Sequence, residues 1–103
     1  MKPATVLLPL VVSCLAGCAS QPASDAAAAE RAIARAARSG AGVWAPGELR
    51  RAEEKMALAR RWLAAGDAAP ARWLAQQAEV DAELAAVKSA ARAAMRTVAA
   101  SKS

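Results

Sequence analysis

The sequence predicts an all-α fold: an antiparallel helical hairpin with a long third helix and an Ala-rich N-terminal helix, a three-helix arrangement. Hydrophobic residues make up 56% of the chain, yet Phe and Tyr are absent and alanine is the dominant apolar residue, which favours helices. Apolar residues also recur at alternating spacings of three and four in two segments, which a Gly-Asp pair separates. The short supply of large apolar side chains predicts a thin core.

Residues 1–17 have the features of a cleaved export signal. Lys2 precedes an apolar run over residues 5–16, which is too short for a bilayer core that takes about 20 apolar residues to span. The run ends in Leu15-Ala16-Gly17-Cys18, and this quartet resembles the lipobox of bacterial lipoproteins. The resemblance implies cleavage before Cys18 and acylation, including a palmitate, of its sulfur and new amino group, an anchor that needs no transmembrane helix. An ordinary secretory signal with a coincidental cysteine is the alternative.

The residue after Cys18 bears on location. In Gram-negative lipoproteins an aspartate at this position is the usual mark for retention in the inner membrane, and this chain has Ala19. The resemblance therefore implies a periplasm-facing protein of the outer membrane, where nucleic acid is not a partner. Cys14 lies inside the signal and Cys18 is the acylation site, so no disulfide is expected. The net charge of +5, lowered by one when Lys2 is removed, weakly favours an anionic neighbour.

Residues 18–24 are expected to form a polar tether, and residues 25–103 the helical domain. Ser24 is the predicted N-cap of a first helix over residues 25–38, and Gly40 is placed to end that helix. Ile33 is its only large apolar residue. This first helix therefore has a high intrinsic propensity and little to bury.

The second helix has the clearest start in the sequence. Pro46 suits the first helical position, where no amide donor is needed. Glu48 is expected to bond back to the cap amide, and Trp44 and Leu49 occupy the positions of a hydrophobic staple. An apolar stripe then runs along the helix until Gly66 stops it, through Leu49, Ala52, Met56, Ala59 and Leu63.

The third helix begins after its predicted cap Asp67 and runs to about Ala100. One stripe on it is small and consists of Ala71, Leu74 or Ala75, Ala78, Ala82 and Ala85. The other stripe consists of Trp73, Gln77, Val80, Leu84, Val87, Ala91, Ala94 and Val98. Two stripes imply two neighbours: the second helix on the alanines, and the first helix or another chain on the larger residues. The candidate face for a protein partner is Trp73, Val80, Leu84 and Val87.

Two further features have competing interpretations. Trp62 and Trp73 lie near the hairpin tip, where they either pack within the domain or form an exposed aromatic patch. Basic residues recur every four positions after Val87, in a segment that has no acid: Lys88, Arg92 and Arg96. These three are candidate contacts for an anionic partner, either lipid or cell wall, and a solvated helix face is the alternative.

The residue types argue against catalysis. The chain has no His and, after cleavage, no free thiol, so the commonest general base, metal ligand and nucleophile are missing. Carboxylates cluster only at Glu53 with Glu54 and at Glu79, Asp81 and Glu83. Asp81 is expected to be partly buried against Lys55, Arg51 or another hairpin cation. We expect no catalytic residues, no metal and no cofactor, and therefore no enzyme.

Residues 43–82 resemble a bacterial envelope family known as domain of unknown function 4398. The matching residues are Ala45-Pro46, Glu48-Leu49, Ala52, Lys55, Ala59, Gly66-Asp67, Ala71, Leu74-Ala75, Gln77-Ala78 and Asp81-Ala82. The resemblance implies a lipid-anchored helical hairpin. Some family members continue into an OmpA-like domain that binds peptidoglycan, and we expect a short form without it here.

Together these features predict a lipid-anchored cell-envelope protein that acts as a non-catalytic helical interaction module. The alternative is a structural lipoprotein that links the outer membrane to peptidoglycan. The expected partners are the membrane, through the lipid on Cys18, and an envelope protein or a second copy of the chain. Peptidoglycan is a further candidate partner.

Overall fold

The computed structural model describes residues 22–102, so the predicted signal, Cys18 and the first part of the tether lie outside the described residues. Its elements are the helices α2 (Pro22–Arg38), α3 (Ala41–Trp44), α4 (Pro46–Ala64) and α5 (Ala68–Lys102). The predicted all-α fold with a long third arm is confirmed. The short helix α3 was not predicted.

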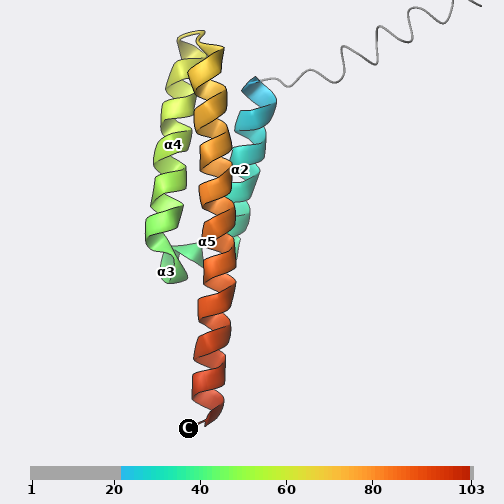
Figure 1. Ribbon diagram of the computed structural model, residues 1–103, viewed down its shortest axis with the longest axis vertical. Helices are drawn as coiled ribbons and strands as arrows, with labels where there is room; N and C mark the ends of the chain where they lie inside the picture. The colour runs from blue at the N-terminus through green and yellow to red at the C-terminus, as the bar shows by residue number, and fades with distance from the viewer. Residues whose placement is uncertain (1–21, 103) are drawn as a thin grey trace, which may run out of the picture.

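Three long helices lie side by side (Figure 1). Helices α4 and α5 form the antiparallel hairpin, and α2 packs against both of them and runs in the same direction as α5. The start of α2 is therefore at the same end as the α4–α5 turn, where Arg72 Nε lies 3.2 Å from Asp25 Oδ2. Helix α5 continues past α3 and ends alone at the opposite end of the molecule (Figure 1).

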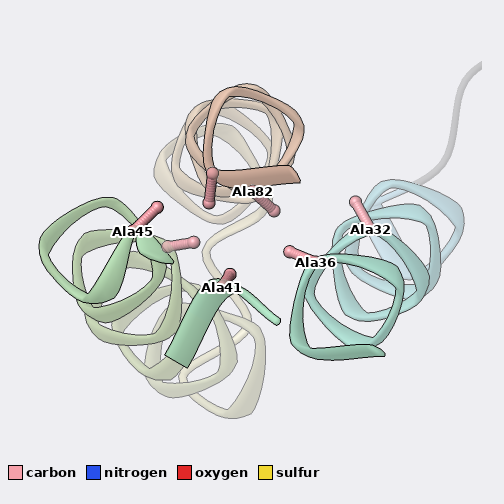
Figure 2. Close-up of a cluster of buried hydrophobic side chains, with 7 residues drawn as sticks. Ala32, Ala36, Ala41, Ala45 and Ala82 are labelled. Carbon is pink, nitrogen blue, oxygen red and sulfur yellow. The ribbon is translucent and has the colours of Figure 1, made fainter. Parts of the chain in front are cut away.

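The interior is built almost entirely of alanine. Figure 2 shows one cluster, in which methyl groups from α2, α3, the start of α4 and α5 converge. Ala82 of α5 is fully buried and points towards this shared space. Small side chains let neighbouring helices approach closely. The buried alanines of the two clusters are Ala26, Ala29, Ala32, Ala36, Ala41, Ala45, Ala52, Ala59, Ala75, Ala78, Ala82 and Ala85, and Met56 is the one large side chain among them.

Both α2 and α4 pack on the alanine stripe of α5. Of the two neighbours expected on the larger residues of α5, the first helix is wrong, and another chain stays a prediction. The reason is physical: α2 offers the alanines Ala26, Ala29, Ala32 and Ala36 for packing, and such a flat surface fits best against another row of methyl groups. One long helix therefore uses a single small-residue stripe for both of its neighbours.

Three of the helix boundaries predicted from the sequence agree with the structure, and one differs. Helix α4 begins at Pro46, α5 begins directly after Asp67, and the left-handed Gly40 (φ 87°) follows α2. Helix α2 begins earlier than predicted, at Pro22, so Ser24 lies in its first turn and is not its cap. Proline is well suited to the first turn because the amide it lacks has no partner there.

We expect the substitution Gly40→Ala to destabilise the domain. Gly40 has a φ of 87°, and an added Cβ would lie 3.1 Å from Trp44 Cδ1. Left-handed backbone costs a residue with a Cβ about 1–2 kcal/mol, which corresponds to a drop in Tm of about 4–16 °C in a domain of this size. Thermal unfolding followed by circular dichroism measures it.

The matched control is Gly47→Ala. Gly47 lies in α4, and a Cβ there has nothing within 4 Å. Because alanine has the higher helix propensity, Tm is expected to stay constant or to rise. Equal losses of Tm in the two variants would show that the conformation of Gly40 is unimportant.

Candidate interaction surfaces

The side of α5 that points away from α2 and α4 carries its large apolar residues. We call it the outer face, and it consists of Trp73, Gln77, Val80, Leu84, Val87, Ala91, Ala94 and Val98. With 3.6 residues per turn, these positions lie opposite the buried alanine stripe. The exposed fractions are 60% for Trp73, 59% for Val80, 42% for Leu84 and 67% for Val87. The four residues predicted as a partner face are thus all exposed in the described chain.

The C-terminal part of α5 extends beyond the other helices. Glu48, near the start of α4, is paired with Lys88, and this contact marks the level at which α4 begins beside α5. All of residues 90–102 are exposed except Ala93, which is partly buried. At 1.5 Å per residue this overhang is about 20 Å long. It leaves Met95 and Val98 exposed at 73% and 52%.

The three predicted anion-binding cations all contact the junction between α3 and α4. Lys88 Nζ donates a hydrogen bond of 2.8 Å to Glu48 Oε1. Arg92 donates to the backbone carbonyl of Trp44, and Arg96 Cζ lies 5.8 Å from the centroid of the Trp44 ring. These contacts fasten the middle of α5 to the α3–α4 junction. The sequence suggested either contacts with an anionic partner or a solvated helix face for these cations, and it did not predict this structural role. Binding to an anionic partner stays a prediction.

The environment of Glu48 also differs from the prediction. Its side chain is only 11% exposed and accepts from Lys88, with Arg51 Nη2 at 3.9 Å, so the predicted bond back to the cap amide is wrong. The amide of the cap residue Ala45 donates instead to the carbonyl of Ala41. Because α3 directly precedes α4, that amide already has an acceptor, and Glu48 is left to pair with α5.

Further ion pairs connect the long helices. Lys55 Nζ lies 2.8 Å from Asp81 Oδ2, with the Asp81 side chain 18% exposed, so the predicted packing of Asp81 against a hairpin cation is confirmed. Arg60 Nε donates a 2.9 Å hydrogen bond to Glu30 Oε1, which joins α4 to α2. These contacts fix how the helices are aligned along one another.

The described residues contain no group of three or more His, Cys, Asp or Glu placed to hold a metal ion. Within residues 22–102, no helix has the length and apolar character needed to cross a bilayer.

A comparison with known protein families identifies the family of the chain. The family model for a domain of unknown function, DUF4398, matches residues 24–101. The chain belongs to the DUF4398 family. The match extends on both sides of the segment whose motifs suggested it, and it takes in most of α2, the hairpin and almost all of the overhang. No curated protein and no solved structure matches the chain significantly.

The hairpin tip of this DUF4398 domain exposes aromatic and aliphatic surface. Trp62 is 41% exposed and Leu58 43%, and both line a shallow pocket with Arg61 and Ala65. Trp73 on α5 is more exposed still, at 60%. Of the two alternatives for the tryptophans, the exposed patch agrees better with this geometry than burial within the domain.

The ion pair of Glu48 predicts how DUF4398 stability depends on pH. The pKa of Glu48 lies below its ordinary value of 4.5, and the hydrogen bond from Lys88 is the largest cause. A backbone hydrogen bond at Glu48 also lowers the pKa, whereas burial of the carboxyl raises it. A carboxyl whose pKa is lower in the folded state stabilises the fold above its unfolded pKa. This stabilisation is lost as the pH falls through the folded pKa.

We therefore expect Glu48→Gln to lower Tm near neutral pH and to reduce the loss of Tm on acidification from about pH 6 to about pH 3. Calorimetric scans across this range measure both effects. Glu54→Gln is the matched control, because Glu54 lies on the same helix with an exposed side chain. Identical pH dependence in the two variants would contradict the role of the Lys88 pair.

Proposed function

We propose that this DUF4398 protein is a lipid-anchored cell-envelope protein that acts as a non-catalytic helical interaction module. One observation carries the proposal: the domain fills its interior with alanine and leaves Trp73, Val80, Leu84 and Val87 of the outer face 42–67% exposed. Apolar surface gains about 25 cal/mol per Å² when it leaves water, so a continuous stripe of this kind favours docking. The outer face is the surface that would meet a partner.

The proposed anchor is Cys18 in the lipobox-like quartet. Only residues 19–21 separate Cys18 from the start of α2. At about 3.5 Å per residue, an acylated Cys18 would keep that end of the bundle within about 14 Å of its lipid. On this proposal the protein faces the periplasm from the outer membrane, with the start of α2 and the hairpin tip nearest the bilayer (Figure 1).

The anchor is tested in cells that make the full-length chain and are fed an alkyne-labelled palmitate. The unaltered protein is expected to take up the label and to sediment with the outer membrane, whereas Cys18→Ser loses both properties. Cys14→Ser is the matched control and should keep the label, since Cys14 lies in the segment that is removed. Membrane association that persists unlabelled in Cys18→Ser would refute lipid anchoring through this residue.

The interaction role is tested by a photo-crosslinking amino acid at position 84 of the same full-length chain. A defined crosslinked product is expected from position 84 and not from the control position 53, an exposed residue of α4. If neither position gives a product in intact envelopes, the outer face has no partner and the proposed role fails.

A second candidate function is a structural link from the outer membrane to peptidoglycan. The observation in its favour is that α5 carries Lys102 to the end of the molecule opposite the start of α2 (Figure 1). A covalent link would yield muropeptides that carry a peptide of this chain after lysozyme digestion of purified sacculi. Sacculi without any such peptide would eliminate the covalent version.

A further inference from the structure

We infer that the outer face of α5 binds a second copy of this chain, with the two α5 helices antiparallel. The inference rests on the proposed function, because it names the partner of the same face. The outer-face positions 73, 77, 80, 84, 87, 91, 94 and 98 alternate in spacing between four and three, which is the heptad pattern of a coiled-coil seam. In the antiparallel alignment that uses the whole seam, Leu84 faces Val87 of the second copy and Trp73 faces its Val98.

The sizes of the side chains favour the antiparallel alignment. The first half of the outer face carries Trp73, Gln77, Val80 and Leu84, whereas the second half carries the smaller residues Val87, Ala91, Ala94 and Val98. An antiparallel pair sets large residues against small ones and keeps the two helices evenly spaced. A parallel pair would set tryptophan against tryptophan at position 73 and alanine against alanine at positions 91 and 94, which leaves voids.

The charges on α5 favour the same alignment. Residues 73–87 contain Glu79, Asp81 and Glu83 and no cation, whereas the segment after Val87 contains four cations and no acid. When the intramolecular pairs Lys55–Asp81 and Lys88–Glu48 are set aside, the first half keeps Glu79 and Glu83. The second half keeps Arg92, Arg96 and Lys102. Antiparallel pairing places a half with net negative charge beside a half with net positive charge, whereas parallel pairing places like charges together. Arg92 and Arg96 contribute to this preference only at long range, because they contact Trp44 on the side of α5 away from the outer face.

Parallel pairing offers one attractive contact, between Glu83 and Lys88 of the second copy. Lys88 already donates to Glu48 at 2.8 Å, so that contact would compete with an existing ion pair. The antiparallel arrangement leaves the Lys88–Glu48 pair intact.

The overhang of α5 is explained by this pairing. Residues 90–102 extend beyond α4 and are almost all exposed, although a helix segment of this length gains little stability on its own in water. In the antiparallel pair, the outer-face positions 91, 94 and 98 of the overhang face positions 80, 77 and 73 of the other copy. Helices α2 and α4 pack on the opposite side of α5 and leave the seam open. The seam spans about 37 Å, and the two-fold arrangement closes on itself.

Sedimentation equilibrium tests the pairing in the full chain with Cys14→Ser and Cys18→Ser, which removes acylation and all thiols. We expect a concentration-dependent dimer. Leu84→Glu with Val87→Glu should raise the dimer Kd at least about tenfold, because it places charge in the seam. Val43→Glu is the matched control, since Val43 is 76% exposed and lies on α3, away from the outer face. An unaltered Kd in the double variant would overturn the inference and assign any association to another segment.

Spin labels on single introduced cysteines test the orientation in the same full chain. In an antiparallel pair, position 98 of one copy lies about 38 Å along the seam from position 98 of the other copy, because each residue rises 1.5 Å. Labels at position 87 are expected close together, within about 20 Å. Short distances at both positions would show parallel pairing and would overturn the antiparallel alignment.

A matched charge reversal gives an independent readout. Glu79→Lys with Glu83→Lys should weaken the dimer, whereas Glu53→Lys with Glu54→Lys, the same change on α4, should leave its Kd unchanged. Equal effects of the two reversals would contradict the charge argument.

The crosslinker at position 84 separates failure of this inference from failure of the proposed function. A chain that is monomeric by sedimentation but crosslinks to a different envelope protein overturns the second-copy partner and leaves the interaction role standing. A chain that is monomeric and gives no product overturns both.

Discussion

Ala82→Leu is expected to destabilise the domain by about 1–3 kcal/mol and to lower its Tm by about 4–20 °C. Ala82 is fully buried, and its methyl group points into the space that α5 shares with α2, α3 and α4 (Figure 2). A leucine there has to push apart helices that approach closely because their contact residues are alanines. The substitution thus adds hydrophobic volume and still weakens the fold. Thermal and urea unfolding measure the change.

Ala57→Leu is the matched control, because Ala57 is exposed on α4 and its leucine variant meets solvent. Its Tm is expected to change by no more than about 4 °C. If Ala82→Leu were as stable as Ala57→Leu, the close helix packing described for the alanine core would be wrong.

Met56→Ala is expected to cost about 2–5 kcal/mol and to lower Tm by about 8–40 °C. Met56 is 1% exposed and packs in a cluster with Ala26, Ala29, Ala59 and others. The fully buried neighbours of Met56 in this cluster are alanines, which have no side-chain freedom with which to fill the cavity that a truncated Met56 leaves. The free energy of unfolding from urea titration gives the cost directly.

Met95→Ala provides the comparison for the same chemical change. Met95 is 73% exposed on the overhang, so its truncation leaves no cavity, and we expect almost no change in the free energy of unfolding. Similar costs at the two methionines would contradict the position of Met56 in the core.

Local signals in the sequence predicted most of the helix boundaries. Pro46, Gly40 and the Gly66-Asp67 pair act on their own neighbours, and each ends or begins a helix where expected. The start of α2 was missed because Ser24 and Pro22 both suit the beginning of a helix, and the sequence does not rank them. The short helix α3 was missed because its four residues carry no periodic pattern.

Contacts between distant segments were harder to predict. The register of the hairpin predicted a cation of α4 beside Asp81, with Lys55 and Arg51 among the candidates, and the structure has Lys55 there. Lys88, Arg92 and Arg96 border the alanine stripe, and this position could have indicated that they meet α4 and the residues before it. Their contacts with Trp44 and Glu48 depend on α3, which shapes the junction.

The outer face shows what a periodic pattern determines and what it leaves open. The spacing of Trp73, Val80, Leu84 and Val87 correctly placed them on one side of α5. Spacing alone does not say which of two apolar stripes lies inside. The alanines are inside because α2, and much of α4, also offer alanines, so the larger residues have no complementary surface within the described chain.

The small stripe of α5 holds the fold together, and the larger stripe does not. The most direct test is the Tm of the full chain carrying Val80→Ala, Leu84→Ala and Val87→Ala together, at a concentration where the unaltered chain is monomeric. Alanine keeps the helix propensity high, so we expect a Tm within about 5 °C of the unaltered chain. A fall of more than about 15 °C would instead place these residues in the core.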